Sequence, residues 1–158
     1  MSKARKRMKL VLTRQKVDKS WSCRTVTEED TGPLAKLMLA AYSGTIDYDG
    51  ETLEDALFEV HGVFQGKVGN FQELCSFAIE DQGRFVSAII LTLWKEKPLL
   101  AYSMTHPDFK SRGMATYLLK SAINALLTFG YKELFLVVTD GNAPAQHVYE
   151  KVGFIPVE

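Results

Sequence analysis

The most constraining feature of this sequence is a junction at residues 106–123, HPDFKSRGMATYLLKSAI, where a polar turn leads directly into an apolar helix. The preceding run LLAYSMT, residues 99–105, has strand-like content, and apolar side chains at helical spacing predict a helix over residues 113–129. A helix start leaves backbone N–H groups without partners and carries partial positive charge. The junction therefore predicts a strand, a tight turn and an exposed helix start in succession.

The residues at this junction suit an anion. Gly113 and Ala115 keep the first helical turn free of bulky side chains, while Lys110 and Arg112 add positive charge. We interpret the stretch as a candidate pyrophosphate seat, although a plain helix start with a basic rim would have the same composition. The P-loop and the three-glycine dinucleotide motif are both absent.

Hydrophobic periodicity predicts the other elements. Helices are expected after Thr31 and from Thr52, and Asn142 is expected to cap a short helix that ends at Gly153. The continuous apolar run 133–139 predicts a central strand buried on both faces. The remaining strands are expected as a hairpin of 8–17 with 21–30, a hairpin of 73–80 with 85–94, and a last strand at 154–158. This order predicts an α/β fold with a mixed, largely antiparallel sheet.

Length and composition limit the class of protein. The 158 residues, 46% of them apolar, suit one domain with a full core. No apolar run is long enough to span a bilayer, and the amino terminus lacks a signal-peptide core, so we expect a cytoplasmic protein. Cys23 and Cys75 lack metal-binding spacing and are expected to be buried free thiols, with no metal site.

Charge is balanced over the chain but uneven along it. Residues 1–19 hold eight basic residues and one acid. Such an arm can bind nucleic acid, but without interleaved aromatic residues we favour a solvated tail or an outer strand. We therefore expect a basic extension at residues 1–20, with a possible extra strand, followed by a single domain at residues 21–158.

Two motifs together give a family resemblance. Lys110-Ser111-Arg112-Gly113-Met114-Ala115 matches the pattern Gln/Arg-x-x-Gly-x-Gly/Ala at the start of a central helix. One strand later, the pattern Asn-x-x-Ala-x-x-x-Tyr-x-x-x-Gly-Phe is matched by Asn142, Ala145, Tyr149, Gly153 and Phe154. The chain thereby resembles the GCN5-related N-acetyltransferase (GNAT) superfamily over residues 21–157. The resemblance implies helices on both faces of a sheet that splays between its fourth and fifth core strands.

The resemblance also implies acetyl-CoA as cosubstrate. Its pyrophosphate would rest on the amides of residues 111–116, and its pantetheine arm would lie between strands 99–105 and 133–139. The Met104 amide would polarise the thioester carbonyl, and Asn142 would contact the pantetheine or order its turn. The cofactor-binding residues implied are Met104, Thr105, His106, Lys110, Ser111, Arg112, Gly113, Met114, Ala115, Thr116, Asn142, Ala145 and Tyr149.

The implied activity is acetyl transfer to a primary amine by direct attack. Tyr149 would protonate the departing thiolate, because a phenol is a mild acid whose position matters more than its strength. A core or surface aromatic would explain the same residue. The alternative function is a non-catalytic CoA-binding or sensor domain of the same fold.

Two departures from the family pattern affect the chemistry. Lys110 replaces Gln or Arg, which keeps a cation but loses the planar fork. Ala101 stands where many relatives have a glutamate base, with Tyr102 beside it. No general base can be transferred to this sequence, so a water chain or an acid from elsewhere must deprotonate the amine.

An acidic segment is the candidate acceptor site. Asp47, Asp49 and Glu51 lie between the first two predicted helices, a connection that borders the acceptor in this fold. Three carboxylates would favour a small cationic acceptor such as a polyamine, an aminoglycoside or a lysine, although a solvated acidic loop has the same residues. The chain also has one strand fewer than expected after Phe154. Strand 8–17 could fill that edge in its own subunit or in a homodimer partner.

Overall fold

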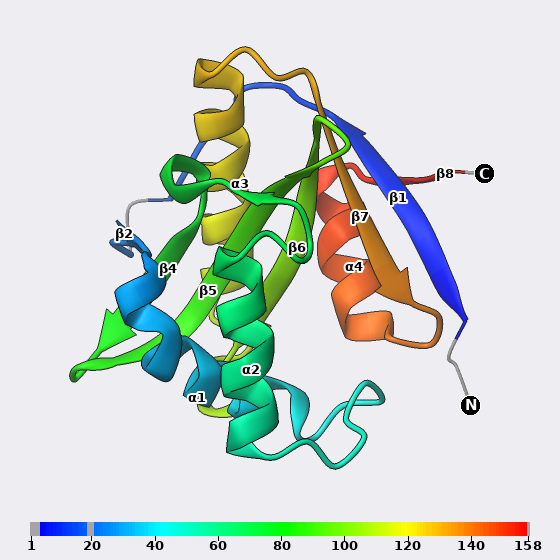
Figure 1. Ribbon diagram of the computed structural model, residues 1–158. Helices are drawn as coiled ribbons and strands as arrows, with labels where there is room; N and C mark the ends of the chain where they lie inside the picture. Colours follow the sequence, from blue (N-terminus) through cyan, green and yellow to red (C-terminus); the bar gives the residue numbers. More distant parts are fainter. Residues whose placement is uncertain (1–3, 19–20, 158) are drawn as a thin grey trace.

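One twisted sheet runs through the computed structural model, with its strands in the spatial order β2-β4-β5-β6-β7-β1-β8 (Figure 1). The structure describes residues 4–18 and 21–157. The ends of the predicted extension, residues 1–3 and 19–20, and the last residue of the final predicted strand, residue 158, lie outside these ranges. The strands are β1 (Arg5–Val11), β2 (Arg24–Thr25), β3 (Asn70–Phe71), β4 (Phe77–Asp81), β5 (Arg84–Trp94), β6 (Lys97–Thr105), β7 (Glu133–Thr139) and β8 (Ile155–Val157).

Helices cover both faces of the sheet, as predicted. One face packs on α1 (Thr31–Tyr42) and α2 (Leu53–Phe64), with a core that includes Leu34, Val60 and Met104. The other packs on α3 (Met114–Thr128) and α4 (Ala143–Val152) around Leu118 and Leu136. Short 3-10 turns occupy Glu28–Asp30, Glu73–Cys75 and Pro107–Phe109. In the described ranges, no helix combines the length and the apolar character needed to cross a bilayer.

Neighbouring strands β6 and β7 pair only briefly. They run parallel, and their register joins Leu99 to Phe135 and Leu100 to Leu136. Beyond Leu100 the two strands diverge (Figure 1). All other strand pairs of the sheet are antiparallel. The mixed, largely antiparallel α/β fold with a splay between two central strands is therefore confirmed.

The amino-terminal strand lies in an unexpected place. The predicted hairpin of residues 8–17 with 21–30 is wrong, because β1 pairs with β7 along its whole length and β8 pairs on its other side. Strand β2 pairs with β4 at the opposite edge of the sheet. The intervening segment crosses α3, where the Asn124 side chain bonds both the N–H (2.8 Å) and the carbonyl (2.9 Å) of Gln15. The strand thus occupies the vacant position within its own chain.

Strand β7 is buried on one face only, which corrects the expectation of burial on both. Leu134, Leu136 and Val138 are buried against α3 and α4, whereas Val137 is 47% exposed. Helices α1 and α2 pack over β5 and β6 instead and leave this face of β7 and β1 uncovered (Figure 1). The apolar run 133–139 has the same composition whether its strand is buried on one face or on both. The sequence pattern alone therefore could not distinguish these two arrangements.

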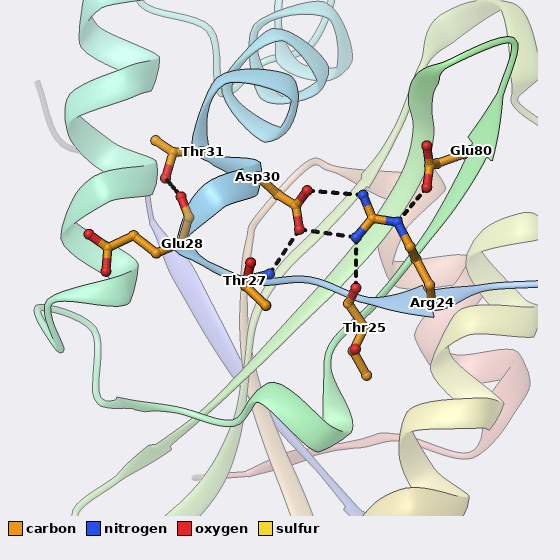
Figure 2. A network of polar contacts seen from close by, with 7 residues as sticks. All are labelled: Arg24, Thr25, Thr27, Glu28, Asp30, Thr31 and Glu80. Atoms are coloured by element: carbon orange, nitrogen blue, oxygen red, sulfur yellow. Dashed lines mark hydrogen bonds and ion pairs between the residues drawn. The ribbon is translucent and has the colours of Figure 1, made fainter.

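A charged network fixes the entrance to α1 (Figure 2). The Arg24 guanidinium donates to both carboxylate oxygens of Asp30, at 2.9 and 3.1 Å, and to the Glu80 carboxylate. Asp30 also accepts the Thr27 amide at 2.9 Å, and Arg24 lies 4.8 Å above the Phe85 ring. The network therefore joins β2, β4 and the 3-10 turn that precedes α1.

We expect β1 to contribute strongly to stability. Met8 is 1% exposed in the core against α3, so Met8→Ala should lower the free energy of unfolding by about 2–5 kcal/mol, because it leaves a cavity. Arg7→Ala, on the exposed face of the same strand, is the matched control and should change it by less than about 0.5 kcal/mol. Urea denaturation measures both. Equal effects of the two substitutions would contradict the placement of β1.

The contribution of Asp30 should depend on pH. Its hydrogen bond with Arg24 holds the pKa of the Asp30 carboxyl below its usual range. The stabilisation is therefore fully present above the unfolded pKa of about 3.9 and is lost as the pH falls through the lower folded value. At pH 7, Asp30→Asn should cost about 1 kcal/mol, since Arg24 is half exposed.

This difference from the wild type should shrink below about pH 4, as measured by chemical denaturation across a pH series. Glu29→Gln, a change at the exposed neighbour, should have little effect at any pH. A constant cost of Asp30→Asn down to pH 2 would contradict the ion-pair explanation.

Candidate active site

The turn between β6 and α3 is held by its own backbone. The His106 amide donates to the Val86 carbonyl at 2.8 Å, and the His106 Nδ1 accepts the Asp108 amide at 3.1 Å. Arg112 then closes the turn with a 3.2 Å bond to the Asp108 carbonyl. Gly113 has φ +83°, a left-handed conformation that favours glycine, and it is the N-cap of α3. The predicted glycine is therefore required by the turn itself.

The start of α3 is left open. No side chain caps it, and the first N–H to bond the chain is that of Tyr117, which donates to the Gly113 carbonyl at 2.9 Å. Within the described residues, no protein acceptor is recorded for the amides of residues 111–116. Lys110, Ser111 and Arg112 are exposed around them. These open amides with adjacent cations suit a diphosphate, so the residues present fit the cofactor that the sequence implied.

The exposed edge of β6 presents different amides from those expected. Because His106 donates toward β5 and Met104 pairs with Ala88 in the antiparallel ladder, strand alternation turns the Met104 amide toward β5 as well. The amides of Ser103 and Thr105 face the splay instead. The expectation that the Met104 and His106 amides bond the cofactor is thereby corrected, since both are directed to the sheet. Strand alternation gives the direction of each β6 amide only when the register of β6 with β5 is known.

Tyr149 reaches across the splay from α4. Its hydroxyl lies beside the Ser103 side chain on β6, and its ring lies edge-on to Phe154 with centroids 5.8 Å apart. Burial is the main cause that raises the pKa of Tyr149 to about 12, while the nearby Ser103 hydroxyl lowers it. The phenol therefore keeps its proton at neutral pH and lies where the two strands diverge.

Asp47 lies close to this phenol. Its carboxylate accepts the Thr139 hydroxyl at 2.7 Å and the Asn142 amide at 3.4 Å, which ties the α1–α2 connection to the end of β7. Asn142 also caps α4, through a 3.4 Å bond from the Ala145 amide, so its role here is to order the turn. The charge of Asp47 contributes to the raised pKa of Tyr149.

The other two predicted acceptor residues lie farther out. Asp49 and Glu51 are exposed, and the Glu51 carboxylate accepts the Asp49 amide at 2.8 Å. The structure therefore brings one of the three predicted carboxylates to the phenol and leaves two on the outside of the connection. No pattern in the sequence separates them, because turn geometry decides which carboxylate points inward.

Three side chains at this centre were missed by the sequence reasoning as site residues. Tyr102 on β6 lies near Glu59 on α2, whose negative charge helps to raise the pKa of Tyr102, and Tyr42 on α1 lies near Tyr149 and Asp47. Burial raises the pKa of Tyr42 and of Tyr102 well above the usual range. Tyr42 falls at the apolar spacing of helix α1, and Glu59 resembles any surface acid of an amphipathic helix, so only the fold brings them together.

The assembled centre contains three protonated phenols and two carboxylates from five elements. Phenols offer O–H donors, and the carboxylates of Asp47 and Glu59 offer acceptors for a cationic group. Over the described ranges, no three His, Cys, Asp or Glu side chains converge on a point that could hold a metal ion. The arrangement can therefore hold an ammonium group beside a proton donor at the mouth of the splay.

Comparisons with known proteins agree with this geometry. The family model "Acetyltransferase (GNAT) family" matches residues 38–154. A GCN5-related N-acetyltransferase from Sphaerobacter thermophilus has a TM-score of 0.73 at 15% identity, over 97% of this chain and 48% of that one. The PaiA N-acetyltransferase from Thermoplasma acidophilum, solved with coenzyme A, has a TM-score of 0.67 at 19% identity, over 85% and 89%.

A third similar structure is AAC(6')-Iy in complex with the bisubstrate analogue CoA-S-monomethyl-acetylneamine. It has a TM-score of 0.64 at 16% identity, over 87% of this chain and 92% of that one. No curated protein sequence matches the chain. The chain spans about half the length of the Sphaerobacter protein. Since the family model covers most of the sequence, from residue 38 to residue 154, the chain belongs to the GNAT acetyltransferase family.

Proposed function

We propose that this chain transfers an acetyl group from acetyl-CoA to a primary amine by direct attack. The observation that carries the proposal is the position of Tyr149, whose hydroxyl lies beside Ser103 across the splay, while the open amides of α3 follow the end of β6. Acetyl-CoA has its phosphates and its thioester far apart, so it needs a phosphate site and a proton donor at separate points. The open amides and Tyr149 would meet these two needs.

The cofactor seat would use the turn and the edge of β6. The amides of residues 111–116 would bind the pyrophosphate, with Lys110 and Arg112 at the rim. The Ser103 and Thr105 amides would bond the pantetheine arm like an added strand. The bound cofactor supplies an activated acyl thioester, and the chain's own task is to orient it and to manage protons.

Tyr149 would supply the proton to the departing sulfur. Its raised pKa keeps the phenol protonated, and its hydroxyl lies beside Ser103 on the β6 side of the splay. Asp47 would accept the proton that the acceptor ammonium must lose before it attacks, which replaces the carboxylate missing at Ala101. The Thr139 and Asn142 bonds would hold that carboxylate in place, and the Glu59–Tyr102 pair would line the acceptor on its α2 side.

The acceptor would be a small cation. Asp47 places negative charge beside the phenols, and the exposed Glu59, Asp49 and Glu51 add more around it. One structural neighbour, AAC(6')-Iy, holds an analogue of an acetylated aminoglycoside amine, which supports a cationic acceptor for this fold. Spermidine, neamine and lysine are suitable first probes, with free thiol release as the readout.

Replacement of Tyr149 by Phe tests the catalytic role. Turnover of the best probe amine should fall about 100-fold, because the general acid is lost while the ring packing against Phe154 remains. The Kd for acetyl-CoA should stay unchanged in calorimetry. Tyr117→Phe, which removes a hydroxyl from α3 that faces Cys23, is the control and should retain full activity. Tight CoA binding with no turnover of any amine by the wild type would favour the non-catalytic alternative.

Replacement of Asp47 by Asn tests the acceptor end. The value of kcat/KM for the probe amine should fall about 100-fold, since the proton acceptor is removed, while the Kd for acetyl-CoA holds. Asp49→Asn is the matched control, and its outward position predicts a small effect. Equal losses from the two substitutions would show that charge in the connection matters in general and would contradict a specific role for Asp47.

A further inference from the structure

A second hollow lies beside the turn between β6 and α3, away from the phenols and carboxylates of the candidate active site. It has a volume of about 280 Å³ and lies between α1, the β4–β5 hairpin and His106. Buried Leu37 and Phe85 contribute apolar surface, while Lys36 and Arg84 lie exposed in its wall. No carboxylate lines it. The hollow therefore combines an apolar surface with positive charge.

The two cations at this hollow form no salt bridge within the described part of the chain, although Asp81 stands opposite Arg84 in the β4–β5 hairpin. The exposed Asp108 lies close to His106, with its Oδ2 3.8 Å from Nδ1. Since Nδ1 accepts the Asp108 amide, the neutral ring carries its proton on Nε2 and can donate from that atom. Two cations and a ring N–H thus border one space.

The hollow also adjoins the cofactor turn. The Arg84 guanidinium lies 5.5 Å from the centre of the Phe109 ring, and that of Arg112 lies 4.8 Å from the same centre. Phe109 belongs to the turn whose later amides are open, so Arg84 joins the hollow to the proposed pyrophosphate seat. Neighbouring cations repel one another, and a dianion between them would remove that cost.

We propose that this hollow binds a phosphate monoester carried on an apolar group. A dianion matches the two cations and the ring N–H, and the carrying group would contact Leu37 and Phe85. Two sources have this chemistry. One is the 3′-phosphate of CoA itself, and the other is a separate phosphorylated metabolite that binds beside the cofactor. The site is distinct from the groups assigned to acetyl transfer, so it can be tested by binding alone.

Calorimetry on the whole chain with phenyl phosphate as the probe tests the proposal. Arg84→Gln and Lys36→Gln should each raise its Kd about tenfold, because each removes one charge-assisted contact. Arg14→Gln, at an exposed cation of the segment between β1 and β2, is the control and should leave the Kd unchanged. Lys36 lies on α1, outside the turn between β6 and α3. A raised Kd in Lys36→Gln would therefore reflect a lost contact with the phosphate and not a distorted turn.

Two further titrations distinguish the sources. If the 3′-phosphate of CoA occupies the hollow, Arg84→Gln weakens CoA but not 3′-dephospho-CoA, and only CoA displaces phenyl phosphate. If a separate metabolite is the ligand, phenyl phosphate binds the CoA-saturated protein with the same Kd. The proposal is overturned if neither substitution affects phenyl phosphate, or if CoA and dephospho-CoA displace it equally, because the anion would then sit in the pyrophosphate seat.

Discussion

The parting of β6 from β7 is the constraint on which the rest of the structure depends. Paired strands satisfy each other's backbone groups, and these two stop pairing after Leu100 and Leu136. The amides of Ser103 and Thr105 are left facing the side from which β7 has diverged, and the Ser103 side chain lies beside the Tyr149 hydroxyl. Backbone amides without strand partners favour an extended polar ligand that can pair with them. The splay therefore suits a ligand such as the pantetheine arm.

The splay can persist because β7 is held from its other side. Its register with β1 extends from Arg5–Thr139 to Val11–Glu133, whereas its register with β6 covers two positions. Strand β8 is short and pairs, among the described strands, with β1 alone. Without β1, β8 would have no partner and β7 would keep only its brief pairing with β6. The amino-terminal strand thus provides the support that allows β7 to leave β6, although it contributes no side chain to the open amides.

Local patterns predicted most of the helices and strands, and non-local pairing limited the rest. The α2 start at Thr52 follows from a capping box with Asp55, whose contacts lie within four residues. The partners of β1 could not be predicted in this way, because they lie more than a hundred residues away and a strand pattern does not name its neighbour. The prediction that the strand 133–139 is buried on both faces was wrong for the same reason. The exposure of Val137 depends on where α1 and α2 pack.

The candidate site shows the same division. The exposed α3 start was predictable, because Gly113, Ala115 and the basic residues are contiguous in the sequence. The orientation of the Met104 amide was not, because it depends on whether a residue faces β5 or the splay. Glu59 was equally hidden, since its relation to Tyr102 arises only when α2 packs across β6.

The distribution of charge orders the two ligands along the splay. Cations gather near the start of α3, where Lys110 and Arg112 flank the open amides and Arg84 lies over the Phe109 ring, whereas Asp47 and Glu59 lie near the phenols. An anionic cofactor and a cationic acceptor would each be repelled from the wrong end.

Part of the basic amino-terminal arm belongs to the sheet. Strand β1 incorporates these residues, and its Lys9 lies 3.3 Å from Glu133. Arg5 lies near enough to Tyr102 to oppose the rise in the pKa of that phenol. Its positive charge thus offsets part of the negative charge near Tyr102 and Glu59. The neutral total charge of the chain therefore conceals two opposite local charges, a cationic region at the start of α3 and an anionic region near the phenols.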